Sequence, residues 1–253
     1  MDINVTGGLA AAGGGILVNA GASAYLFNTA VFDNKAATVP NAVATGGGIR
    51  NDGTLICDKT NITANWSTDN GGGIYNTGSL VVRGGSLITG NHADSDGGGI
   101  FNDAGASADI ADSNIESNWA GDQAAQWVGR GGGIFNTGTL LMSGSTLSNN
   151  SVHHTLCRGG GLFCESGSSA TLSNVSVTGN SARNNANNGK GGGFYLRTGA
   201  SLTMLECILS GNQADVLASV GGWKEDGSIF SWSGNPPDDA IGPHLDFASR
   251  DRH

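Results

Sequence analysis

Three consecutive glycines followed by a bulky apolar residue recur along the chain and constrain its fold more than any other feature. The triplets begin at Gly13, Gly46, Gly71, Gly97, Gly131, Gly159 and Gly191, with a weaker copy at Gly221. A unit that recurs every few dozen residues indicates stacked repeats, in which each unit buries the apolar face of its neighbour. The repeat therefore predicts one elongated domain rather than one or two globular ones.

Alignment on the triplets places apolar residues in columns. The column directly after the glycines is Ile16, Ile49, Ile74, Ile100, Ile134, Leu162 and Phe194. Two more columns, two residues apart, begin at Ala24 and Leu26, and a third segment contributes Val31, Ile62, Ile88, Ile115, Leu147, Val177 and Leu209. Apolar residues two apart with polar residues between them are typical of strands. We therefore predict an all-β fold, a parallel β-helix of about seven to eight coils with three short strands in each.

An asparagine follows the third strand of every coil. This column is Asn34, Asn65, Asn91, Asn118, Asn150, Asn180 and Asn212, and a shorter one after the glycines is Asn51, Asn76, Asn102 and Asn136. A stacked amide can bond both the next coil and the local backbone. Both columns are thus predicted to be structural ladders rather than catalytic groups.

The spacing between the ladder asparagine and the next triplet varies, whereas the spacing from triplet to asparagine is nearly constant. Insertions should therefore emerge from one corner of the coil, which in repeat proteins is often the binding face. After Asn212 the pattern weakens. We predict β-helix repeats over residues 1–220 and an imperfect last coil with a cap over residues 221–253. No comparable cap precedes the first coil, so we expect further residues or a docked partner to cover that end.

Composition narrows the partners and the compartment. The net charge of −9 argues against nucleic acid as a partner, because nucleic-acid binding needs a basic surface. No apolar run approaches a membrane span, and no leader is visible, so we expect an extracellular, cell-surface or organelle-lumen protein. No Cys-x-x-Cys spacing occurs; Cys157 and Cys164 could pair across a turn, but buried free thiols are favoured.

Two units of the repeat resemble a known family. The segments Gly71–Asn76 and Val31–Asn34 resemble the polymorphic outer-membrane protein repeats of chlamydiae, which contain a Gly-Gly-x-Ile unit and a Phe-x-x-Asn unit. The resemblance covers about residues 7–220, although a phenylalanine in the second unit occurs only at Phe32, which stands two residues before Asn34 rather than three. It implies a right-handed parallel β-helix, a shape common in bacterial surface proteins and adhesins and also used by polysaccharide enzymes.

Arg130, Arg158 and Lys190 each directly precede one of three successive triplets. Stacked coils would place these cations in one column, ~5 Å apart. Like charges at that spacing repel unless something neutralises them. We hypothesise that they bind an anionic chain such as a uronic-acid or sulfated polysaccharide. The alternative is that nearby carboxylates neutralise them or that they extend into water.

Trp66, His92 and Trp119 occupy the position after the ladder asparagine in successive coils, and Trp127 lies in a long insertion. Exposed rings in such a row could stack on sugars or anchor a protein. The alternative is that loops fold over the rings.

The sequence gives little support for a metal or cofactor site. The pair His153-His154 with Cys157 lacks a third and fourth converging ligand, so no metal site is predicted. No cofactor is predicted; Ca²⁺ is left open through scattered acidic residues, which are Asp94, Asp96, Asp112 and Glu116.

The function expected from these features is a non-catalytic, rigid β-helix that presents a binding surface to a protein or a polysaccharide, as an adhesin or scaffold does. One alternative is an accessory subunit docked on a larger assembly. Another is a lyase or hydrolase acting on an acidic glycan, for which Asp96, Glu116, Arg130 and Arg158 would be the candidates.

Overall fold

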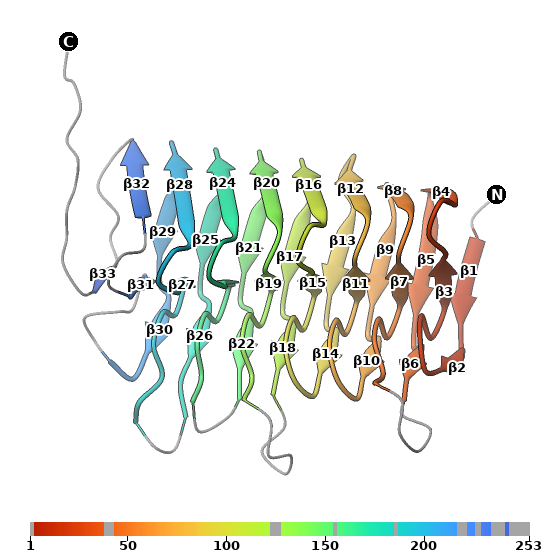
Figure 1. The fold of residues 1–253 in the computed structure, drawn as a ribbon, viewed down its shortest axis with the longest axis horizontal. Coiled ribbons are helices and arrows are strands. Elements are labelled where there is room, and N and C mark those ends of the chain that lie inside the picture. The colour runs from red at the N-terminus through yellow and green to blue at the C-terminus, as the bar shows by residue number, and fades with distance from the viewer. Residues whose placement is uncertain are drawn as a thin grey trace.

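The computed structural model describes residues 3–37, 43–121, 128–153, 156–184, 187–216, 222–225, 229–233 and 241–242. These residues form a solenoid in which all strands stack in parallel, coil upon coil, along one axis (Figure 1). The prediction of an all-β, right-handed parallel β-helix is confirmed. The strands belong to four sheets, which we name by their place in the coil.

The triplet sheet follows the glycines and contains β3 (Ile16–Val18), β7 (Ile49–Asn51), β11 (Ile74–Asn76), β15 (Ile100–Asn102), β19 (Ile134–Asn136), β23 (Leu162–Cys164), β27 (Phe194–Leu196), β31 (Gly222–Lys224) and β33 (Ile241–Gly242). The broad sheet comes next, with β4 (Ser23–Phe27), β8 (Thr54–Asp58), β12 (Ser79–Arg83), β16 (Ser107–Ala111), β20 (Thr139–Ser143), β24 (Ser169–Ser173), β28 (Ser201–Leu205) and β32 (Ile229–Ser233).

The ladder sheet precedes the asparagine column and contains β1 (Ile3–Thr6), β5 (Thr29–Phe32), β9 (Asn61–Thr63), β13 (Leu87–Thr89), β17 (Asn114–Glu116), β21 (Thr146–Ser148), β25 (Ser176–Thr178) and β29 (Ile208–Ser210). The narrow sheet follows that column, with β2 (Leu9–Ala10), β6 (Lys35–Ala36), β10 (Trp66–Ser67), β14 (His92–Ala93), β18 (Trp119–Ala120), β22 (Ser151–Val152), β26 (Ser181–Ala182) and β30 (Gln213–Ala214). The three predicted strands per coil are the first three sheets. The narrow sheet adds a fourth strand, whose two residues are too few to show a periodicity in sequence.

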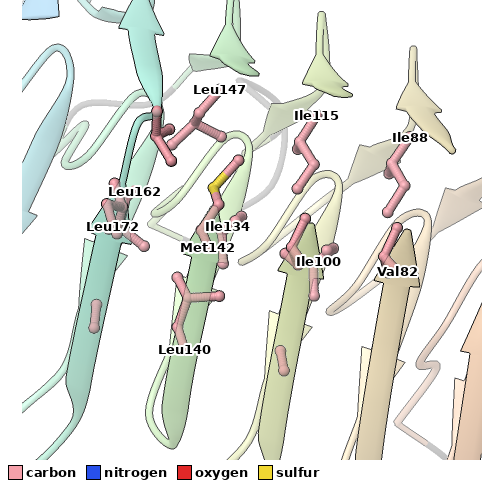
Figure 2. Packing of buried hydrophobic residues seen from close by; sticks show 14 of the residues in the cluster. Val82, Ile88, Ile100, Ile115, Ile134, Leu140, Met142, Leu147, Leu162 and Leu172 are labelled. Atoms are coloured by element: carbon pink, nitrogen blue, oxygen red, sulfur yellow. The ribbon is translucent and has the colours of Figure 1, made fainter. Parts of the chain in front are cut away.

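The core is built from the predicted apolar columns. Ile74 pairs with Ile49 on one side and Ile100 on the other, and the remaining columns are in the same register from coil to coil. Figure 2 shows these side chains converging between the strands, and they form one continuous buried cluster. Each fully buried Ile or Leu contributes roughly 1.5–3 kcal/mol relative to an exposed side chain.

Each glycine of a triplet is required for a different reason, as Gly97, Gly98 and Gly99 illustrate. Gly97 has a φ of +69°, a conformation that L side chains rarely adopt. A Cβ on Gly98 would lie 2.5 Å from the carbonyl oxygen of Gly132 and would also overlap the backbone of Trp119 in the narrow sheet. A Cβ on Gly99 would lie 3.0 Å from Nδ2 of the ladder residue Asn118. The triplet is thus the place where two segments of the coil touch backbone to backbone.

Both asparagine ladders are present. Asn118 Oδ1 accepts hydrogen bonds from the backbone N and from Nδ2 of Asn91, both at 3.0 Å. Its own Nδ2 donates to Asn150 Oδ1 at 3.0 Å and to the carbonyl of Ile88 at 2.9 Å. The same arrangement repeats along the buried column (Asn34, Asn65, Asn91, Asn118, Asn150, Asn180 and Asn212). The shorter ladder runs from Asn51 through Asn76 and Asn102 to Asn136.

Two fully described connections from the narrow sheet to the next triplet, residues 68–73 and 94–99, lie along the same edge of the molecule (Figure 1). Trp127, His154 and Gly221 lie outside the described residues. Beyond residue 220, β31 pairs with β27 and β32 with β28, so the strands found there continue the stack. All four cysteines are buried free thiols, and Cys157 and Cys164 do not pair.

Candidate functional site

The three cations that precede the triplets form a row. Arg130 bridges Arg158, and Arg158 bridges Lys190, through isolated parallel backbone pairs. We call these three residues the cation row. Asp96 holds the same position one coil before Arg130. The register of the coils therefore places these residues in one column, as the sequence indicated, and their contacts decide whether a carboxylate neutralises each cation.

A row of stacked rings lies beside them on the outer side of the triplet sheet. We call it the aromatic row, and its members are Tyr75, Phe101, Phe135, Phe163 and Tyr195. Successive ring centroids are 4.7–5.3 Å apart, with interplanar angles of 3–16°. The sequence did not lead us to predict this stack. Its only signal is an aromatic residue at the second position after the last glycine of five successive triplets.

Two residues of the cation row, Arg130 and Arg158, cover three rings of the aromatic row. The guanidinium carbon of Arg130 lies 4.8 Å from the Phe135 centroid and 5.3 Å from that of Phe163. Arg158 lies 5.1 Å from the Tyr195 centroid. Phe163 is 0% exposed although it points away from the core. Cation–π contacts and the packing of the arginine side-chain stems on the rings therefore help to bury and stabilise the aromatic row.

Arg130 is neutralised. Its Nε and Nη2 donate to the two oxygens of Asp96, at 3.0 and 2.6 Å, and its Nη1 donates to Glu165 at 3.3 Å. Glu165 also contacts Arg197 at 3.2 Å. The sequence left open whether nearby carboxylates neutralise these cations, and for Arg130 they do.

Asp96 is almost completely buried, and its titration follows from that. Burial raises the pKa of its carboxyl to about 6, although the hydrogen bonds from Arg130 act to lower it. Between about pH 4 and pH 6 the folded chain therefore keeps a proton that the unfolded chain has lost. This group consequently makes the fold less stable as the pH rises through that window.

Arg158 and Lys190 differ from Arg130. Within the described part of the chain, neither has a carboxylate oxygen within 4 Å. Lys190 Nζ lies instead 4.0 Å from the ring centroid of Trp223. Both cations are partly exposed. The part of the row that can meet an external anion is thus the pair Arg158–Lys190.

The predicted tryptophans form a second row, on the outer side of the narrow sheet. The His92 ring stacks on Trp66 at 5.9 Å and on Trp119 at 4.6 Å, and Lys35 Nζ lies 3.4 Å from the Trp66 centroid. Asp94 accepts a hydrogen bond from Trp66 Nε1 at 2.8 Å and lies 3.3 Å from His92 Nε2. The rings therefore cover one another's faces, and Trp66 and His92 present mainly their edges to solvent.

The remaining candidates are dispersed. Glu116 lies on the outer side of the ladder sheet, away from the bonded pair Asp96–Arg130. His153 Nε2 lies 2.9 Å from Ser151 Oγ. Across the described ranges, no group of three or more His, Cys, Asp or Glu side chains is placed to hold a metal ion. In the same ranges, no helix has the length and apolarity needed to cross a membrane.

Residues 85–103 match the Chlamydia polymorphic membrane protein repeat. This segment joins the ladder residue Asn91 to the triplet at Gly97 and to β15, and the same pattern recurs in the other coils. This match and the parallel β-helix of the structure fit the repeat family that the sequence resembles. No curated protein and no solved structure gives a match to it.

Replacement of Arg130 by methionine tests the buried pair. Arg130→Met leaves the Asp96 carboxylate buried without its partner, so we expect a loss of about 2–3 kcal/mol in unfolding free energy at pH 8. At pH 5 the loss should be smaller, because Asp96 is then protonated and no unpaired charge remains. Denaturant unfolding at both pH values measures the difference. Asp96→Asn combined with Arg130→Met should recover most of the stability at pH 8; an equal loss at both pH values would contradict this account.

Proposed function

We propose that this protein is a non-catalytic, adhesin-like scaffold at a cell surface, whose rigid β-helix presents outer side chains to an extended ligand. The match to a membrane protein repeat supports the surface location. The observation that carries the proposal is the register of the outer rows, in which like side chains hold the same position in three successive coils of the cation row and five of the aromatic row, ~4.8 Å apart. A surface with such a repeat suits a ligand that is itself a repeating polymer.

The chemistry of the open pair points to an acidic polysaccharide. Arg158 and Lys190 are adjacent in the row, lie over the rings of Tyr195 and Trp223, and have no carboxylate oxygen within 4 Å among the described residues, although the charge of Arg158 still acts on Glu225 from a longer distance. Repulsion between two neighbouring cations is relieved when an anion binds both. Arg130 is not part of this pair, because Asp96 and Glu165 already satisfy it.

Affinity for heparin and for polygalacturonate tests the proposal. We expect Arg158→Ala with Lys190→Ala to weaken binding about tenfold or more and to reduce the dependence of affinity on salt. Arg50→Ala with Arg183→Ala is the matched control, because it removes two cations from parts of the surface outside this site and the one proposed below. Equal weakening in both double variants, or no binding by the natural chain, would count against the ligand class.

The same polysaccharides, incubated with the protein, test whether it is catalytic. A non-catalytic scaffold should release no new reducing or unsaturated sugar ends. Their appearance would replace the scaffold with a lyase or hydrolase.

A further inference from the structure

A pair of half-exposed rings lies on the outer side of the broad sheet, in its first strand. Tyr25 is 56% exposed and Phe27 is 50% exposed. Both point outward from β4, which they can do together because they are two residues apart. Their centroids are 6.3 Å apart and their planes differ by 22°. Neither ring belongs to the cation row or the aromatic row, which lie on the triplet sheet.

Fixed polar groups border these rings. Asp58, on the next strand, accepts hydrogen bonds from Tyr25 Oη at 3.2 Å and from Arg83 Nε at 3.0 Å. Lys59 Nζ lies 5.6 Å from the Phe27 centroid. The Arg83 side chain is about half exposed, so its guanidinium can still donate to a ligand. We name Tyr25, Phe27, Asp58, Lys59 and Arg83 the Tyr25–Phe27 patch.

The patch is small. Ile56 and Val81 extend its apolar surface across β8 and β12, but the next residue in their row is Asp109 on β16. The apolar part therefore spans three strands, or roughly 10 Å from the first to the third. A stable protein interface buries about 800 Å² on each partner, far more than this area offers. A protein would also have to desolvate the Asp58–Arg83 pair and Lys59, which is costly.

We propose that the Tyr25–Phe27 patch binds one or two pyranose rings of a neutral glycan. The apolar face of a sugar ring would pack on Tyr25 and Phe27. Its hydroxyl groups would donate to Asp58 and accept from Arg83 and Lys59. The tyrosine hydroxyl, bonded to Asp58, holds the carboxylate and the ring in a fixed relation before the ligand arrives.

Titration calorimetry with three neutral hexasaccharides, cellohexaose, chitohexaose and maltohexaose, tests this site. The natural chain should bind at least one of them. Removal of one ring by Tyr25→Ala or Phe27→Ala should weaken that binding by up to about tenfold, and removal of both rings should weaken it further. Tyr25→Phe, which keeps the ring, should retain more affinity than Tyr25→Ala.

Leu141→Ala is the matched control, because Leu141 is 48% exposed on the same face of the same sheet, in β20. It should leave binding unchanged, and thermal unfolding should show all variants folded. The proposal is overturned if no hexasaccharide binds, or if the control weakens binding as much as the ring variants do. Arg158→Ala with Lys190→Ala should not affect neutral glycans, so failure of either site is distinguishable from failure of the other.

Discussion

Replacement of Gly98 by alanine is expected to cost about 4 kcal/mol or more of unfolding free energy, one of the two largest losses that we expect from a single substitution in this chain. The added Cβ would lie 2.5 Å from the carbonyl oxygen of Gly132 in the next coil and would overlap the backbone of Trp119. Both obstacles are backbone atoms held in parallel ladders, so neither can rotate away as a side chain would. The coil must open or the stack must bend.

Gly105→Ala is the control for the loss of a glycine. Gly105 has a φ of +78°, and nothing lies within 4 Å of the position that its Cβ would take. Its replacement should cost only the strain of a left-handed residue, about 1–2 kcal/mol. Denaturant unfolding of the two variants in parallel separates steric overlap from backbone strain. If Gly98→Ala were no worse than Gly105→Ala, the close backbone contact at the triplet would be wrong.

Asn118→Ala should cost about 3–5 kcal/mol, because it leaves several buried groups without partners. The backbone N–H and the side-chain amide of Asn91 lose their shared acceptor, and the carbonyl of Ile88 loses its donor. A buried polar group left unsatisfied costs about 1–3 kcal/mol. Asn118 is fully buried, so water cannot easily take its place.

The effect of this substitution should also be local. Each coil contacts only its neighbours, so a defect in the ladder weakens the coupling between the coils on either side. Hydrogen exchange should become faster in β13, β17 and β21 before it changes at either end of the solenoid. Asn61→Ala, at an exposed outer position of β9, provides the control and should stay within about 0.5 kcal/mol of the natural chain. Similar losses in the two variants would show that the ladder adds little.

The pair Asp96–Arg130 shows how an outer position can become an interior one. Arg130 leaves the backbone on the outer side of the triplet sheet, yet it covers Phe135 and Phe163 and binds a carboxylate that is almost fully buried. Its charge serves this layer rather than a ligand. All three cations hold the same position in the repeat. Arg130 therefore differs from Arg158 and Lys190 because different side chains surround it.

The sequence alone was enough to predict the β-helix, the inward columns and both asparagine ladders. Residues equivalent to Ile74, Leu80 and Asn91 occur at nearly the same sequence distance from the triplet in other coils. Residues at equivalent positions must stack when the coils are in register. The need for glycine at Gly98 and Gly99, where no side chain fits, follows from the same repetition. The fourth strand escaped prediction because two residues hold no period.

Only the tertiary structure decided what the outer side chains do. Arg130 meets Glu165, which is 35 residues further along the chain, and the faces of Trp66 and His92 are covered by residues from neighbouring coils. Tyr25 on β4 donates a hydrogen bond to Asp58 on the adjacent strand β8. Apart from the cation row and the aromatic row, most outer positions hold unlike residues from coil to coil, so their partners depend on which residues the register brings together. The repeat determines where each side chain stands; its burial and charge depend on the neighbours that the stacking supplies.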